Sequence, residues 1–304
     1  VEAAVGLGYR RNDDYNGEEQ EGVGHFQMTM RNGRRCSSAA AFLKPALKRP
    51  NLHVFTGAQT EGLILEAKRA VGIRFRRGDQ TVEARARHEV VLSAGALGSP
   101  HLLMLSGIGA GDDLRQHGIE VVANLPGVGR NLQDHLQARP VFKTTGSTIN
   151  SETRHPLQYV GIAMQYALKR SGPMAMAASL GTAFLKTRPE LATPDIQFHI
   201  QPFSADKPGD GMHPFSAFTA SVLQLRPESA GHLALKSSSP DDHIVIHPNY
   251  LATKTDCDAI VAGIKVARAV SAAEPVASMI TEEFSPGPGV AENDDEAILD
   301  WARN

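Results

Sequence analysis

Residues 88–109, HEVVLSAGALGSPHLLMLSGIG, decide the fold. The first six residues are typical of a strand, and a glycine turn then leads into an apolar helical segment. Ser99 suits the N-cap of that helix and Pro100 its first position. The sequence therefore predicts a strand, a tight turn and a helix. Glycines let a ligand approach the backbone and a helix N-terminus attracts anions, although tight packing alone also explains such a turn.

The segments before this turn predict a sheet, and the segments after it predict a helix, a strand and a Pro/Gly loop. The composition changes near residue 138, beyond which helices alternate with amphipathic strands. Strands are expected at 52–55, 63–67, 70–75, 81–86, 119–124, 195–201, 216–226 and 231–237, and helices at 37–47, 112–117, 156–170, 254–273 and 292–304.

The overall composition is that of an ordinary globular protein. Among 304 residues, 31 Lys and Arg face 33 Asp and Glu, and 41% of the residues are apolar, which excludes disorder and a fibre. The length allows about two domains. A net charge of −2 gives no electrostatic reason to expect nucleic acid or an anionic membrane as a partner.

The sequence predicts neither a metal site nor a transmembrane helix. Cys36 and Cys257 lie far apart, without the close spacing of a zinc site or a redox pair. The uncharged stretch 90–111 is interrupted by Pro100 and five glycines, so it predicts a buried segment and no transmembrane helix. We expect a cytoplasmic protein, with peripheral association at the inner membrane as the alternative.

Several other patterns resemble active-site motifs and are interpreted structurally. The segment GIGAGD at 107–112 lacks the last glycine of a dinucleotide fingerprint. Ser179 in AASLG lacks the preceding strand of a nucleophile elbow, so a hydrolase is only a distant alternative. His243 and His247 lie on an extended segment, too far apart to share a metal. Asp134 and His135 could form an acid/base pair, but adjacent residues of an extended chain point to opposite faces.

Several blocks together resemble the glucose-methanol-choline (GMC) oxidoreductases, flavoenzymes that oxidise alcohols. The segment GALGSPHLLMLSGIG at 95–109 is similar to the second signature of the family. The resemblance runs from about residue 12 to the end and is greatest to the choline and aliphatic-alcohol dehydrogenase branch. Further blocks follow in the family's order: DYNGEEQEGVGHFQ, NGRRCSSAAAFLKPAL, RPNLHVFTGA, AVGIRFR, LPGVGRNLQDH, PDIQFHIQP and LRPESAGHLALKS.

The resemblance implies a mixed α/β (α+β) fold with two functional parts. Residues 47–137 would form part of an FAD-binding domain, and 138–304 a substrate domain with an antiparallel sheet and flanking helices. Residues 1–46 would be a connection that contributes to the substrate domain. The FAD-binding residues implied are Thr60, where the family usually has Val and uses its backbone, and Ser93, Ala94 and Gly95, which would line the ADP half of FAD.

Two departures from the family pattern limit what this chain is expected to do. It contains no GxGxxG, which in the family holds the pyrophosphate, and it stops before the active-site His block. We therefore expect an internal fragment of an FAD-dependent alcohol dehydrogenase that is inactive by itself and carries no catalytic residue of its own. A non-catalytic scaffold or binding protein with the same fold is the alternative.

The expected substrate is a small alcohol, oxidised by hydride transfer to the flavin, with a quinone or O2 as the unknown electron acceptor. Choline-specific relatives carry a Glu near the position of Leu180, ahead of a Phe that corresponds to Phe184. No carboxylate occurs between Pro173 and Leu185. Because a buried cation needs a charge partner or an aromatic cage, the sequence favours a neutral primary alcohol over choline.

Overall fold

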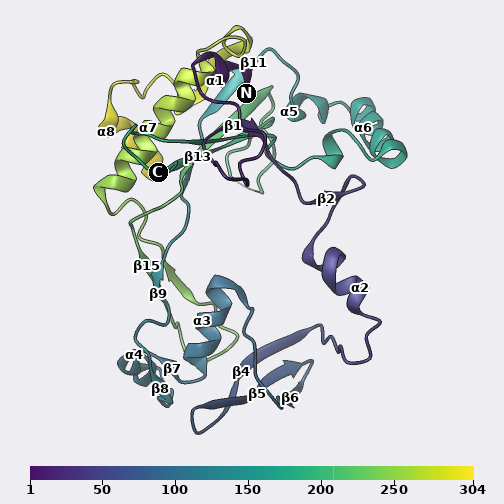
Figure 1. Ribbon diagram of the computed structural model, residues 1–304, viewed down its shortest axis with the longest axis vertical. Coiled ribbons are helices and arrows are strands. Elements are labelled where there is room, and N and C mark those ends of the chain that lie inside the picture. The colour runs from purple at the N-terminus through teal and green to yellow at the C-terminus, as the bar shows by residue number, and fades with distance from the viewer. Residues whose placement is uncertain (208) are drawn as a thin grey trace. The chain divides into compact units, whose positions relative to one another are not determined.

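The computed structural model describes residues 1–207 and 209–304, which divide into two compact units (Figure 1). Unit 1 comprises 1–46, 135–228 and 251–304, and unit 2 comprises 47–134 and 229–250. Both contain helices and antiparallel strands, so the predicted mixed α/β class is confirmed. None of the described helices is both long enough and apolar enough to cross a bilayer.

Unit 1 is built on a seven-stranded antiparallel sheet. The central strand β14 pairs with β13 on one side and with β10 and β11 on the other. The sheet order is β1 (Gly22–His25), β12 (Gly181–Leu185), β13 (Ile196–Gln201), β14 (Ala217–Gln224), β11 (Val141–Thr144) and β17 (Ile280–Ser285), with β10 (Gln137–Ala138) also on β14.

Three helices cover one face of this sheet: α1 (Glu2–Gly6), α7 (Lys254–Ser271) and α8 (Asp295–Arg303) (Figure 1). Gly263 of α7 lies so close to β14 that an added Cβ would come within 2.4 Å of Val222. Helix α7 therefore packs closely against β14 at this point. The fully buried members of the core between the helices and the sheet include Ile196, Val222, Ile260, Ile264 and Ile298.

The remaining elements of unit 1 are short or lie at its surface. They are the hairpin β2 (Met30–Arg31) and β3 (Arg34–Arg35), the helical turns Ala39–Leu43, Pro173–Ala175 and Ala277–Met279, and the helices α2 (Lys44–Ala46), α5 (Ile149–Glu152) and α6 (Pro156–Lys169).

Unit 2 contains an antiparallel meander and a small core to which two helices and a strand contribute. Buried Met104, Leu114, Leu233 and Leu235 form that core. The meander is β4 (Ala58–Glu66), β5 (Arg69–Arg77) and β6 (Gln80–Arg85); the helices are α3 (Gly95–Leu105) and α4 (Gly111–Gln116). Two further sheets are small. One pairs β7 (Ile108–Gly109) with β8 (Ala123–Asn124), and the other has β15 (Gly231–Ala234) between β9 (Arg130–Leu132) and β16 (Val245–His247).

The prediction of a strand, a turn and a helix for residues 88–109 was only partly right. Residues 88–93 are not a strand, because no neighbouring strand among the described residues accepts their hydrogen bonds, and the same holds for 52–55. The helix begins at Gly95, four residues before Ser99. Pro100 therefore lies inside α3, and the Ser99 Oγ accepts a hydrogen bond from the Ala94 N–H at 3.1 Å.

The expected domain boundaries also differ from the contacts. The change of unit after residue 134 lies close to the expected boundary at 137, but 229–250 pack with unit 2. The strand expected at 231–237 joins β9, about 100 residues earlier in the chain, and not β13 and β14. Only Ala123–Asn124 of the strand expected at 119–124 is paired.

Candidate functional site

The two faces of the unit 1 sheet differ in chemistry, because side chains of a strand alternate between faces. On β13, Ile196 and Phe198 belong to the apolar core under α7. The alternate residues Gln197, His199 and Gln201 lie on the opposite face. Thr182 of β12 and Thr219 and Ser221 of β14 share that face by register, and all three are buried. We call these six residues the polar face.

A row of polar side chains crosses this face at His199. Thr182 lies directly opposite His199 on one side and Ser221 on the other. Directly opposite residues of one face have Cβ atoms about 5 Å apart. The Ser221 hydroxyl is buried and has no hydrogen-bond partner among the described residues. The row therefore combines an imidazole with a hydroxyl whose hydrogen-bonding capacity is unused.

The environment of His199 favours its neutral form. Burial lowers the pKa of the imidazole below its ordinary value of 6.5, and the nearby His135 lowers it further. A neutral imidazole has one nitrogen that accepts a hydrogen bond and one that donates. His199 can thus accept a hydrogen bond from a hydroxyl, which a protonated ring could not do.

Aromatic rings border the polar face. The Phe26 ring meets His199 edge-on, with ring centroids 5.0 Å apart and planes at 83°. Tyr15 lies 5.0 Å from Phe184 and 6.3 Å from Phe26, and its hydroxyl accepts a hydrogen bond from the Gln27 N–H. Tyr15 and Phe184 are buried. The face therefore offers an apolar wall next to its polar row.

Arg139 adds a positive charge beside the polar face. It directly follows β10, and its Nη2 donates to the Oε1 of Gln201 at 3.4 Å. Its Nη1 is buried without a hydrogen-bond partner, and burial lowers the pKa of the guanidinium. The group stays charged near neutral pH nevertheless. A cation placed on the polar face would be repelled by it.

The turn expected to hold FAD lies in unit 2 and is open. Ser93, Ala94 and Gly95 are all exposed, and Gly95 has a φ of +82°. Nothing lies within 4 Å of the position that a Cβ on Gly95 would take. Neighbouring side chains therefore do not fill the bend. The first turn of α3 holds no acidic residue, so its positive end is free of a competing carboxylate.

The surroundings of Gly95 leave space for a ligand. The bend leaves room for a ligand beside Gly95, and the first N–H groups of the 11-residue helix α3 have no helical partners. Thr60 lies apart from the bend on β4, half-buried and paired with Phe75. The contact shown between β4 and α3 is at the other end of the helix, where the Leu63 N–H donates to Ser106 at 2.9 Å.

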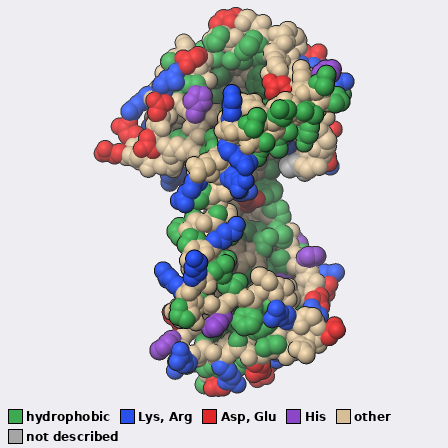
Figure 2. All heavy atoms as spheres, turned by 90° about the vertical axis from the view of Figure 1, so that its right-hand side faces the viewer, with side chains coloured by type: hydrophobic (Ala, Val, Ile, Leu, Met, Phe, Trp, Pro, Cys, Tyr) green, Lys and Arg blue, Asp and Glu red, His purple; other side chains and the backbone are tan. Residues whose placement is uncertain are grey.

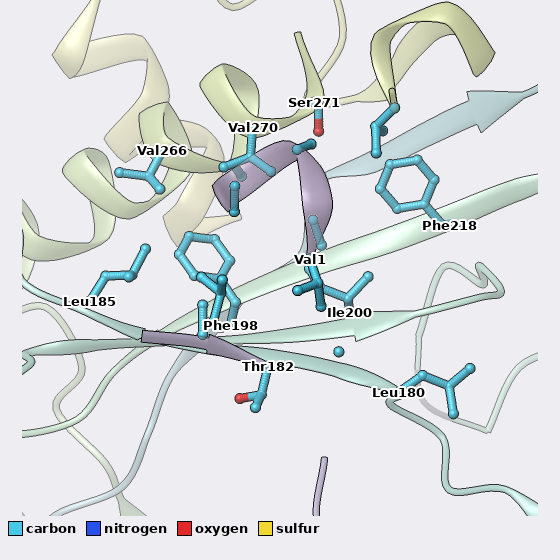
Figure 3. A pocket seen from close by; sticks show the side chains of 18 of the residues that line it. Val1, Leu180, Thr182, Leu185, Phe198, Ile200, Phe218, Val266, Val270 and Ser271 are labelled. Atoms are coloured by element: carbon cyan, nitrogen blue, oxygen red, sulfur yellow. The ribbon is translucent and has the colours of Figure 1, made fainter. Parts of the chain in front are cut away.

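An apolar cavity of about 250 Å³ lies on the opposite face of the unit 1 sheet, between α1, the sheet and α7 (Figure 3). Phe198, Ile200, Val266 and Val270 line it, while the hydroxyl of Thr182 points away from it. The polar row at His199 therefore does not open into this cavity.

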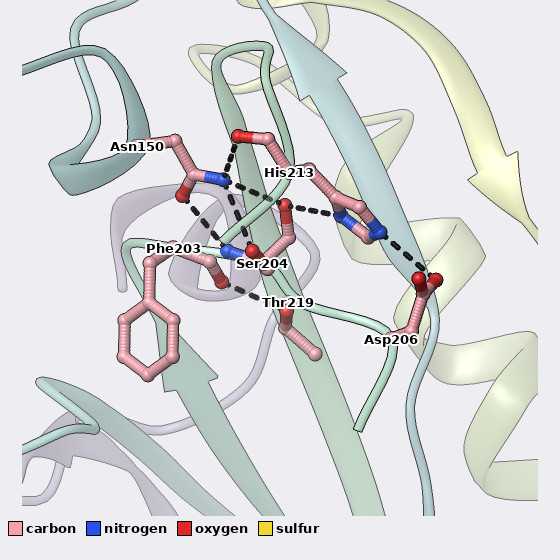
Figure 4. Close-up of polar contacts among 6 residues, drawn as sticks. All are labelled: Asn150, Phe203, Ser204, Asp206, His213 and Thr219. Carbon is pink, nitrogen blue, oxygen red and sulfur yellow. Dashed lines mark hydrogen bonds and ion pairs between the residues drawn. The ribbon is translucent and has the colours of Figure 1, made fainter. Parts of the chain in front are cut away.

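A second polar cluster organises the loop between β13 and β14 (Figure 4). His213 Nδ1 lies 3.0 Å from Ser204 Oγ, and its Nε2 lies 3.0 Å from Asp206 Oδ1. Asn150 fixes the same loop by donating to the carbonyl oxygens of Ser204 and His213, both at 3.0 Å. Ser204 is fully buried, so this triad of side chains holds the loop and does not present a nucleophile.

The structure also decides the other possible active-site motifs of the sequence, namely the nucleophile elbow, the acid/base pair and the metal site. Ser179 precedes strand β12 and no helix follows it, which excludes a nucleophile elbow. Asp134 accepts a hydrogen bond from the Tyr250 hydroxyl, whereas His135 contacts the carbonyl of Leu225, so the two do not act as a pair. The described residues contain no cluster of three or more potential metal ligands.

Sequence reasoning missed His199, Ser221 and Arg139. One signal was present, because QFHIQ at 197–201 alternates polar and apolar residues, and a His on the polar side of a buried strand is a candidate binding residue. The pairing of Ser221 with His199 depends on the register between two strands, which the sequence does not show.

Comparison with known proteins gives the family. Sequence models of the GMC oxidoreductase family match residues 1–137 and 227–304. Mouse mitochondrial choline dehydrogenase is 39% identical over 95% of this chain and 49% of its own length. The alcohol dehydrogenase [acceptor] of Pseudomonas putida is 38% identical over 99% of this chain and 55% of its own length. The chain thus spans about half the length of the curated relatives it matches.

Solved structures share the fold of this chain. Pyridoxine 4-oxidase from Mesorbium loti superposes with a TM-score of 0.84 at 26% identity, over all of this chain and 55% of the oxidase. An FAD-dependent oxidoreductase from Chaetomium thermophilum shares the fold, with a TM-score of 0.85 at 21% identity over 99% of this chain and 59% of its own. FAD is accordingly the expected cofactor. From the two family matches and these relatives, the chain belongs to the GMC oxidoreductase family.

Proposed function

We propose that the protein carrying this chain oxidises a primary alcohol to the aldehyde in an FAD-dependent reaction. The observation that carries the proposal is the polar face, where a neutral His199 lies beside the unpaired hydroxyl of Ser221 in a chain of the GMC family. A base of the longer protein takes the hydroxyl proton, while a hydride leaves the carbon that bears the hydroxyl. Bound FAD supplies the acceptor for that hydride.

Two groups of residues in this chain have roles in the proposal. His199 accepts a hydrogen bond from the substrate hydroxyl and so orients the carbon that is oxidised, while the Phe26 ring borders the apolar part of the substrate. In unit 2, Ser93, Ala94 and Gly95 line the ADP half of FAD, and the backbone of Thr60 contacts the adenine. The openness of the bend at Gly95 supports this assignment.

Replacing His199 tests its role in binding. His199→Asn retains a hydrogen-bonding group, whereas His199→Ala removes it, so we expect kcat/KM to fall by about tenfold to a hundredfold in His199→Ala and by less in His199→Asn. The measurement is alcohol-dependent reduction of an artificial acceptor by the longer protein. Equal kcat/KM in all three proteins would rule out a contact between His199 and the substrate.

We propose a neutral primary alcohol, aliphatic or aromatic, as the substrate in preference to choline. No carboxylate occurs between Pro173 and Leu185, and Arg139 places a positive charge beside the polar face. Both features disfavour a quaternary ammonium. Arg139→Met should raise kcat/KM for choline relative to that for a medium-chain alcohol. Choline oxidation with much the higher kcat/KM in the unmodified protein would contradict the proposal.

We further propose that the 304-residue chain alone does not turn over. It has no GxGxxG to hold the pyrophosphate, and its curated relatives are about twice as long. A flavin absorbance scan of the purified chain should show little or no FAD, and a stoichiometric yellow preparation would contradict this. We propose a quinone or O2 as the electron acceptor. The proposed location of the protein is the cytoplasm or the periphery of the inner membrane.

A further inference from the structure

Helix α6 of unit 1 carries an apolar stripe that no other described part of the protein covers. None of its 14 residues is buried. Leu157, Val160, Met164 and Leu168 are 87%, 53%, 57% and 77% exposed, respectively. Their spacing of three, four and four residues places them on one side of the helix. Ile162 and Tyr166 are half-buried on the other side, so α6 is apolar on both its inner and outer faces.

Basic side chains surround this stripe. Arg154 and His155 precede α6, and Lys169 and Arg170 follow its last apolar residue. At that end the turn of the β2–β3 hairpin touches the helix, because a Cβ on Gly33 would lie 2.1 Å from the carbonyl oxygen of Arg170. The hairpin carries three exposed arginines, Arg31, Arg34 and Arg35, and two exposed methionines, Met28 and Met30, lie on it or just before it.

Acidic residues are absent from both segments. The sequence contains no Asp or Glu between Glu21 and Glu61, or between Glu152 and Glu190. In the part of the chain that the structure describes, none of the six Arg and Lys residues named above forms an ion pair, which leaves their charge uncompensated. The net charge of −2 therefore conceals an uneven distribution. Figure 2, which shows the side that carries α6, has hydrophobic side chains gathered there with Lys and Arg side chains beside them.

We propose that this face, the α6 stripe with the β2–β3 hairpin, docks on an anionic lipid surface. An exposed apolar helix side bordered by basic residues is what interfacial helices use to insert among lipid acyl chains while contacting acidic headgroups. A second copy of the chain is a poorer occupant, because a two-fold contact would place basic residues against basic residues. The proposal concerns attachment to the surface only and does not rest on the proposed alcohol oxidation.

Vesicle sedimentation tests this proposal with the purified chain. Vesicles of phosphatidylcholine mixed with phosphatidylglycerol should bind the chain, with affinity that falls as salt rises, and vesicles of phosphatidylcholine alone should bind it much less. The variants Leu157→Ser/Leu168→Ser and Arg34→Glu/Arg35→Glu should each weaken binding to the mixed vesicles by about tenfold or more. All four side chains are exposed, so circular dichroism should show unchanged folding.

Two variants in unit 2 serve as matched controls. Leu125 is 52% exposed and Arg87 is exposed, so Leu125→Ser and Arg87→Glu make the same types of substitution at residues outside this face and should bind like the unmodified chain. Equal binding to both kinds of vesicle, or unaltered binding of both α6-face variants, would overturn the proposal. Loss of a concentration-dependent dimer in Leu157→Ser/Leu168→Ser, without vesicle binding by the unmodified chain, would assign the face to self-association instead.

Discussion

Ser221 lies directly opposite His199 on the neighbouring strands β14 and β13, and its hydroxyl is buried without a hydrogen-bond partner among the described residues. An unsatisfied buried hydroxyl costs about 1–3 kcal/mol of stability. Such groups are uncommon in folded proteins and call for an explanation. A substrate hydroxyl at His199 supplies one, because it brings a hydrogen-bonding group to the same row.

Ser221→Ala should therefore separate stability from function. Removing an unpaired hydroxyl should leave the free energy of unfolding unchanged or raise it by about 1 kcal/mol, while KM for the alcohol rises in the longer protein. Thr219→Val is the matched control on the same strand and face, because the Thr219 hydroxyl donates to the Phe203 carbonyl at 2.8 Å. Thr219→Val should lose about 1 kcal/mol in urea unfolding. A comparable loss in Ser221→Ala would show that its hydroxyl is satisfied after all.

The pKa of His199 gives a prediction for stability against pH. Burial lowers the pKa in the folded state below the ordinary 6.5, so the unfolded chain binds the proton more readily. The contribution of His199 is therefore intact above pH 6.5 and is lost as the pH falls through the lower, folded-state pKa. His199→Gln should show a smaller loss of unfolding free energy over that acid range. Parallel curves for the two proteins would argue against a buried neutral imidazole.

Tyr250 and Asp134 hold together two ends of unit 2. They are the last residues of its two segments, and the Tyr250 hydroxyl donates to the Asp134 carboxylate. That hydrogen bond, with smaller contributions from burial and the carboxylate charge, raises the pKa of Tyr250 to about 12. The stabilisation is thus complete below pH 10, the ordinary value, and is lost between 10 and 12.

Tyr250→Phe should lower the unfolding free energy at neutral pH by about 1 kcal/mol, a modest value because Tyr250 is 39% exposed. Ultraviolet titration of tyrosinate provides the direct check. The difference between the unmodified chain and Tyr250→Phe should appear near pH 12. A difference centred at pH 10 would mean that the hydrogen bond does not form in solution.

Gly95→Ala should weaken FAD retention in the longer protein. With φ at +82°, an alanine at this position costs about 1–2 kcal/mol of backbone strain even though its Cβ would meet open space. Gly78→Ala, in the turn between β5 and β6, is the matched control, since Gly78 has a φ of +59° and equally open surroundings. Both should lower Tm similarly, but only Gly95→Ala should release flavin on gel filtration. Equal flavin retention in the two would remove Gly95 from the cofactor site.

Local signals in the sequence predicted the elements that depend on near neighbours. Helix α7 follows an amphipathic pattern, and α8 begins where Asp294 accepts a hydrogen bond from Ala297, as expected for a capped helix with an acidic first turn. The strands β13 and β14 show clear alternation or continuous apolar character. These features need no knowledge of distant contacts.

What could not be predicted depends on distant parts of the chain. Residues 88–93 have the composition of a strand, but a strand requires a neighbour to pair with, and Val91 is instead 75% exposed. Pairing of β15 with β9 moved 229–250 into unit 2. The candidate site shows the same limit, since His199 could have been found from alternation alone, whereas its neighbours Ser221 and Thr182 follow only from the strand register.

Anaerobic reduction of the flavin tests the central claim most directly. The longer protein, purified with FAD and mixed with a medium-chain primary alcohol in the absence of an acceptor, should lose its oxidised-flavin absorbance, and His199→Ala should do so at a rate lower by about tenfold or more. A preparation with bound FAD that no primary alcohol reduces, or one whose reduction is unchanged in His199→Ala, would contradict the account.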